Sequence, residues 1–185
     1  SVCDIQMLPL LKVLSHKDAL LFESMLPENI QLYEGYDYMN DSRILRRLTS
    51  KRNTFSFVQL AELCNEYFNV SYFSDSFFSS RYNAFISERA YYSFVFRALK
   101  VKRIFISQNA VQKAMFSVAR ELGIDLSEMQ HGVIYDGHMA YSYPRTIDQL
   151  EKKIYTPSFL LTLSDFWKKE VYLPGAQLLT IGNDN

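Results

Sequence analysis

The stretch VKRIFISQNAVQKAMFSVARELGIDLSEMQ, residues 101–130, decides the fold. It opens with a short apolar run, VKRIFIS at 101–107, which is typical of a buried strand. Apolar side chains then recur at helical spacing from Val111 to Leu122, and Gly123 follows them as a helix-ending glycine. IDLSEMQ at 124–130 predicts a second strand. Strand, amphipathic helix and strand together predict a parallel βαβ unit.

The same alternation continues toward the end of the sequence. SFLLTLS at 158–164 predicts a buried strand, DFWKKEVYL at 165–173 a short helix and QLLTIG at 177–182 a last strand. We therefore expect residues 100–185 to form a Rossmann-like α/β core, in which helices flank a parallel sheet.

Residues 1–99 predict a helix-rich N-terminal part. The apolar residues from Phe57 to Phe68 recur at helical spacing, and about 79–99 lacks Gly and Pro and predicts one long helix. Residues 39–51 are a further helix candidate and 70–73 a weak strand. The start of the chain favours neither structure.

Composition excludes several classes of protein. The chain has 185 residues, of which 48% are apolar and 22% charged, so it can form a core and is not a disordered protein. Twenty basic residues balance twenty acidic ones, which argues against a nucleic-acid partner. Cys3 and Cys64 provide neither a disulfide framework nor a metal knuckle. No apolar run reaches the roughly 20 residues of a membrane span, and no signal peptide opens the sequence. We expect a soluble, cytoplasmic protein.

The most informative motif is EMQHGVIYDGHMAYSYP, residues 128–144. In open parallel sheets, ligands bind beyond the carboxyl ends of the strands, where His131 and Gly132 are expected. An imidazole with a pKa near 6.5 is suited to remove a proton from a hydroxyl. The alternative is a histidine that bonds only to its own loop. His131 and His138, with Asp136 between them, are potential metal ligands. A loop without a third fixed ligand is a poor zinc site, however, so we predict no metal.

Three segments carry a resemblance to a known family. QHG at 130–132, the H-x-x-Y-x-Y-P pattern at 138–144 and LLTLSDFWKKEVYLPGAQLLTIGN at 160–183 resemble the N-terminal half of bacterial GT-B glycosyltransferases of capsule and lipopolysaccharide synthesis. The similarity covers about residues 100–183. It implies an acceptor-binding domain, with a nucleotide-sugar donor bound by a separate C-terminal domain. G-x-G-x-x-G and G-x-x-x-x-G-K-[ST] are both missing, so we expect no cofactor in this chain and no activity from it alone.

The resemblance also implies roles for residues. His131 would be the general base of an inverting transfer, and Asp165 or Asp136 would replace it if desolvation raised their pKa values. The tyrosines at 135, 141 and 143 would either stack on sugar rings or pack the loop onto the domain. We assign the acceptor contacts to eight residues: Gln108, Asn109, Gln130, Gly132, His138, Tyr141, Tyr143 and Ser164.

The partners and two alternative functions remain open at this point. The resemblance implies a saccharide or lipid-linked acceptor. Arg43, Arg46, Arg47 and Lys51 share one helical face, which is either solvated or a peripheral contact with anionic membrane headgroups. A polyol-phosphate transferase of the teichoic-acid type would keep the fold and change the donor. A non-catalytic α/β module would bind a saccharide or a protein partner.

Overall fold

The computed structural model groups the chain into two units. The first contains residues 1–43 and 102–185, and the second contains residues 44–101. Residues 20–23 and 37–40 therefore group with the α/β part of the chain and not with the helical part. Within these units the structure describes residues 20–23, 37–40, 54–107, 112–130, 132–138, 140–147 and 154–182.

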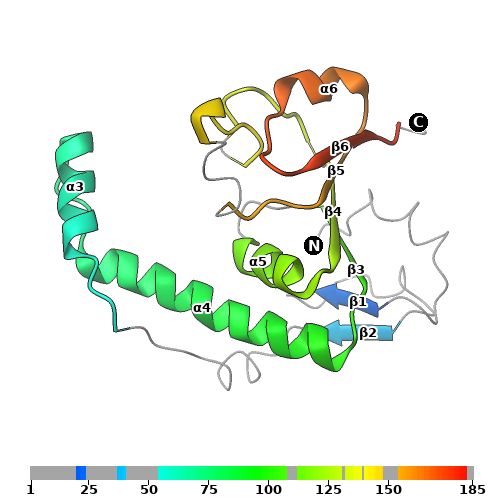
Figure 1. Cartoon of the computed structure of the whole chain (residues 1–185). Helices are drawn as coiled ribbons and strands as arrows, with labels where there is room; N and C mark the ends of the chain where they lie inside the picture. The colour runs from blue at the N-terminus through cyan, green and yellow to red at the C-terminus, as the bar shows by residue number, and fades with distance from the viewer. Residues whose placement is uncertain are drawn as a thin grey trace. The chain divides into compact units, whose positions relative to one another are not determined.

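A four-stranded parallel sheet forms the centre of the first unit (Figure 1). Its strands run in the order β3 (Arg103–Ile106), β4 (Asp125–Met129), β5 (Phe159–Thr162) and β6 (Gln177–Thr180), and every neighbouring pair is parallel. All four strands predicted after residue 100 are present, and the predicted α/β class with a parallel sheet is confirmed.

Helices connect the strands of this sheet. α5 (Lys113–Leu122) joins β3 to β4, and six consecutive residues, 114–119, are buried on it. It ends where Gly123 takes a left-handed conformation with φ 65° and the Ile124 amide bonds back to the carbonyl of Ala119. The short helix α6 (Asp165–Glu170) joins β5 to β6. α5 lies where the periodicity predicts it, whereas α6 ends three residues before the predicted end because Val171 is extended.

An apolar cluster of this unit joins the segment after β4 to β5 and to the residues after α6. Leu160 on β5 is fully buried, and Trp167 of α6 packs against the cluster. Its buried members are Ile134, Ala140, Tyr141, Leu160, Val171 and Leu173. The chain after β4 is therefore attached to the sheet by its own apolar side chains.

The second unit is a pair of helices, α3 (Val58–Phe68) and α4 (Asp75–Ala98). α4 starts four residues before the predicted position because the Ser74 hydroxyl caps its first turn, accepting a hydrogen bond from the Phe77 amide. The weak strand predicted at 70–73 is wrong. This segment links the two helices, and the Asn65 side chain bonds to both backbone groups of Phe73 at 2.9 Å.

A second pair of strands lies in the part of the chain that predicted mainly helices. β1 (Leu20–Glu23) and β2 (Asp37–Asn40) are parallel neighbours. The helix predicted over 39–51 is therefore wrong for its first two residues, and its remainder lies outside the described residues, as do Arg43, Arg46, Arg47 and Lys51. Within the described ranges, no helix is long and apolar enough to cross a membrane.

Candidate functional site

The carboxyl ends of β4, β5 and β6 form one edge of the sheet, called the carboxyl edge below. Gln130 follows β4, Ser164 and Asp165 follow β5, and Gly182 follows β6. Ser164 is the N-cap residue of α6, although its hydroxyl does not bond to the helix. Parallel pairing thus brings several predicted polar residues to one edge. Three others, Gln108, Asn109 and His131, lie outside the described residues.

Gln130 links the ends of two strands. Its side chain is buried, and its Oε1 accepts a hydrogen bond from the Leu163 amide at 3.0 Å. Its Nε2 donates to the Gly132 carbonyl at 2.8 Å, and its backbone amide donates to the Leu161 carbonyl at 2.9 Å. We predicted Gln130 as an acceptor contact. Here both ends of its amide fix the chain after β4 and β5, so it supports the edge from inside.

Asp165 is an exposed carboxylate with two donors. Its Oδ1 accepts hydrogen bonds from the Thr180 hydroxyl at 2.5 Å and from the Lys168 ammonium at 2.9 Å. The Thr180 hydrogen bond, followed by Lys168, lowers the pKa of Asp165. A carboxylate that replaced His131 as the base would need a raised pKa, and Asp165 does not meet this condition. Asp136 lies exposed in a turn of the loop after β4.

His138 anchors the loop that follows the QHG motif. Its Nδ1 accepts a hydrogen bond from the Ala140 amide at 3.2 Å, and its carbonyl accepts from the amides of Tyr141 and Ser142 at 2.9 Å each. The Ser142 hydroxyl bonds to the carbonyls of Tyr135 and Glu170, both at 3.0 Å. The loop is thus closed on itself and fastened to the end of α6.

The three tyrosines of this loop have different environments. Tyr141 is 2% exposed, and its hydroxyl donates a hydrogen bond to Oε1 of Glu128 on β4. Burial, followed by the negative charge of Glu128, raises the pKa of Tyr141 well above its usual value. The Tyr143 hydroxyl accepts from the Lys113 ammonium at 3.3 Å. Tyr135 is 58% exposed. Tyr141 and Tyr143 therefore pack the loop onto the domain, whereas Tyr135 is open to a ligand.

Large apolar side chains are also exposed at the carboxyl edge. Leaving β1 and β2 aside, every exposed large hydrophobic among the described residues of the first unit lies beyond the carboxyl end of β4 or β5, or in or after β6. Hydrogen bonds bring these segments together, since the Ile181 amide donates to the Thr162 carbonyl at 2.9 Å and Gln130 joins the other two. We call this set the rim: Val133, Tyr135, Phe166, Leu179 and Ile181.

Sequence reasoning missed Glu128, Phe166 and Thr180. Glu128 had a detectable signal, because an acidic residue inside a predicted buried strand is unusual and normally needs a partner. Phe166 had no such signal, since Phe166 and Trp167 appear in the sequence simply as an apolar pair. The role of Thr180 depends on the pairing of β5 with β6, which brings it opposite Thr162 and beside Asp165.

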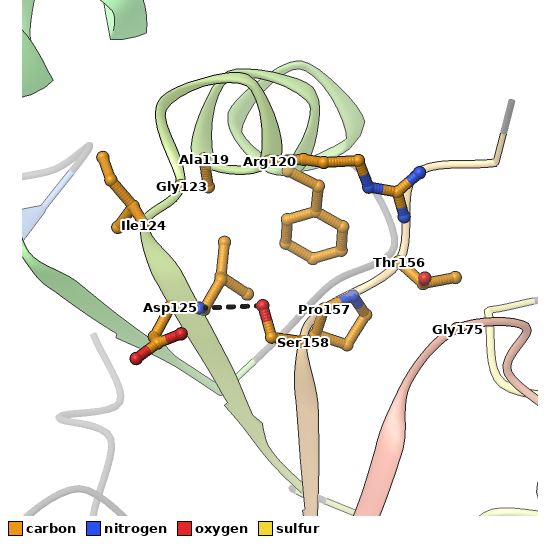
Figure 2. Close-up of a pocket in the computed structure, with 11 residues that line it drawn as sticks. Ala119, Arg120, Gly123, Ile124, Asp125, Thr156, Pro157, Ser158 and Gly175 are labelled. Atoms are coloured by element: carbon orange, nitrogen blue, oxygen red, sulfur yellow. Dashed lines mark hydrogen bonds between the residues drawn. The ribbon is translucent and has the colours of Figure 1, made fainter. Parts of the chain in front are cut away.

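A pocket of about 300 Å³ lies at the opposite, amino end of β4 and β5 (Figure 2). Phe116 and Arg120 line it from α5, and Arg120 lies near Thr156. Two polar side chains that line it are hydrogen-bonded to the backbone. The Ser158 hydroxyl accepts from the Leu126 amide at 3.3 Å, and the Thr156 hydroxyl donates to the Pro174 carbonyl at 2.8 Å. None of our predicted site residues lines this pocket. The candidate site is therefore the carboxyl edge, where ligands of parallel sheets bind.

Comparisons with known proteins identify no relative of this chain. No protein-family model, curated protein or solved structure matches it. Its function is therefore inferred from the sequence motifs and from the geometry of the carboxyl edge.

Proposed function

We propose that this chain is the acceptor-binding half of a GT-B glycosyltransferase. In this proposal, the α/β unit is the Rossmann-like acceptor domain, and a separate domain binds a nucleotide sugar. The sugar is transferred to a hydroxyl of a saccharide or lipid-linked acceptor during surface polysaccharide synthesis in the cytoplasm. The observation that supports the proposal most is the rim, because its exposed rings lie at the edge of the sheet where ligands bind.

The mixed chemistry of the carboxyl edge favours a saccharide over a purely apolar partner. Aromatic rings such as Tyr135 and Phe166 offer apolar faces to the C–H groups of a sugar ring. Ser164 and Asp165 directly precede Phe166 in the chain. Their side chains offer oxygen atoms that can bond to sugar hydroxyls. A ligand with both C–H faces and hydroxyls uses both features.

The proposed reaction is a single displacement. The imidazole of His131 takes the proton of the acceptor hydroxyl as the oxygen attacks the anomeric carbon. The bond from that carbon to the nucleotide diphosphate breaks, and the diphosphate leaves with the bonding electrons. The proton on His131 then passes to solvent. Attack from the side opposite the leaving group inverts the anomeric configuration.

The proposal is tested with a protein in which this chain continues into a donor-binding domain. We expect the transfer of radiolabelled sugar from one of a panel of nucleotide sugars to a saccharide acceptor, and none by the 185-residue chain alone. Turnover by the chain alone contradicts the half-enzyme assignment. Transfer from a nucleotide-activated polyol phosphate supports the teichoic-acid type instead. Saccharide binding without transfer from any donor supports the non-catalytic module.

Replacing the rim aromatics tests the acceptor surface. We expect Tyr135→Ala and Phe166→Ala each to weaken the binding of an acceptor saccharide by about 2- to 10-fold, since one ring contact contributes roughly 0.5–1.5 kcal/mol. The measurement is isothermal titration calorimetry. Tyr67→Ala is the matched control, because Tyr67 is 81% exposed in the helical unit. Unchanged affinity in both rim variants would remove the rim from the acceptor site.

A further inference from the structure

The carboxylate of Glu128 is completely buried in the α/β unit. It lies on β4 with 0% of its surface exposed, and its Oε1 accepts a hydrogen bond from the hydroxyl of Tyr141. Glu128 and Gln130 are two residues apart and therefore share one face of the sheet. A buried carboxylate is costly unless it is hydrogen-bonded. The bond to Tyr141 is therefore a defined contact between strand and loop and not a chance surface contact.

Tyr141 connects this strand to two other parts of the unit. Its ring centre is 4.8 Å from that of His138, the residue that closes the loop. Its carbonyl accepts a hydrogen bond from the Tyr172 amide at 3.0 Å, and the Tyr172 carbonyl accepts from the Tyr143 amide at 2.9 Å. Tyr141 is thus fixed to β4 by its hydroxyl and to the chain after α6 by its backbone. The same loop presents Val133 and Tyr135 to the rim.

We propose that Glu128 and Tyr141 form a positioning pair that holds residues 132–138 and 140–143 on the sheet in the geometry that binds the acceptor. The effect on saccharide binding rests on the proposed function, whereas the effect on the loop itself does not. Tyr141 is protonated at neutral pH as any tyrosine is, and burial and the Glu128 charge raise its pKa further, so the hydroxyl remains a donor. Neither residue touches the reacting atoms in this proposal.

Three conservative variants of the full chain test the pair. Tyr141→Phe keeps the ring in the apolar cluster and removes only the hydroxyl. Glu128→Gln keeps an oxygen that accepts the Tyr141 hydrogen bond. Tyr143→Phe makes the same chemical change two residues further along, at a hydroxyl bonded to Lys113 and not to the sheet. The measurement is hydrogen exchange of the amides of 132–138 and 140–143, compared with those of β5.

We expect exchange in the loop to become about tenfold faster or more in Tyr141→Phe, because a hydrogen bond to a buried carboxylate is lost. Glu128→Gln should show a clearly smaller increase, and so should Tyr143→Phe, because the half-buried Tyr143 hydroxyl bonds to Lys113 and water can replace it there. Equal exchange in Tyr141→Phe and Tyr143→Phe would overturn the proposal. So would an increase in Tyr141→Phe that is as large in β5 as in the loop, since this indicates general destabilisation.

Saccharide binding supplies the second readout. Tyr141→Phe should weaken acceptor binding together with faster loop exchange, whereas Tyr135→Ala should weaken binding with the loop exchange of the wild type. Weakened binding in Tyr141→Phe with unchanged loop exchange would contradict a positioning role. If the wild type binds no saccharide, the proposed function fails, and the exchange experiment still decides whether the pair holds the loop.

Discussion

Replacing His131 with alanine in the complete enzyme is expected to lower the rate of sugar transfer by about 100- to 10,000-fold, the contribution of a positioned general base. The residue lies outside the described part of the structure, so the expectation comes from its place in the QHG motif. The neutral imidazole is the form that accepts a proton. The acidic limb of the pH profile of kcat/KM should therefore lie near pH 6–7 in the wild type and be lost in His131→Ala.

The geometry of the described residues argues against Asp165 and His138 as alternative bases to His131. Asp165 is exposed, and its two donors lower its pKa, so its carboxylate has little affinity for a proton at neutral pH. His138 uses Nδ1 to accept a backbone hydrogen bond. His16→Ala is a matched control, because the same change is made far from the motif in the sequence. A loss of less than about fivefold in His131→Ala, with the acidic limb retained, would exclude His131 as the base.

Replacing Gln130 with leucine is expected to lower the free energy of unfolding of the α/β unit by about 2–4 kcal/mol. The substitution roughly keeps the volume and removes both hydrogen bonds of the side chain. The Leu163 amide loses its partner inside the protein, which costs about 1–3 kcal/mol. The Gly132 carbonyl loses one too, at a smaller cost because Gly132 is exposed and water can replace the donor.

Urea unfolding followed by tryptophan fluorescence measures this effect. The chain has a single tryptophan, Trp167, which packs against the core of the α/β unit and so reports on that unit. Gln59→Leu is the matched control, an exposed glutamine on α3, and should change stability by no more than about 0.5 kcal/mol. A change this small in Gln130→Leu would show that the link between β4 and β5 contributes little.

Local sequence patterns were sufficient for the four-stranded sheet and its helices because each of these elements depends on its neighbours in the chain. The helix α5 follows from its apolar periodicity and from Gly123, whose left-handed conformation ends it. The strands β3 to β6 follow from short apolar runs separated by helical or polar segments. The parallel arrangement follows as well, because α5, the segment between β4 and β5, and the segment that contains α6 are each long enough for a crossover.

Local patterns did not predict the strands at the start of the chain, because these strands depend on pairing between separate segments. Residues 37–40, DYMN, alternate weakly and lack the β-branched residues of a typical strand. They form β2 because β1 pairs with them, a contact between segments that are distant in sequence. At 70–73, the apolar and aromatic residues suggested a strand, but the side chain of Asn65 holds this segment as a linker.

The sequence by itself determined the order of strands and helices from β3 onward and the polar character of the carboxyl edge. Only the tertiary structure decided which polar residues there are exposed and which support the edge. Gln130 and Tyr141 are buried and bonded within the protein, Asp165 is paired with Thr180 and Lys168, and Tyr135 remains exposed. The reason is physical, because periodicity depends on residues close in sequence, whereas burial and hydrogen bonding depend on the segments that folding brings alongside.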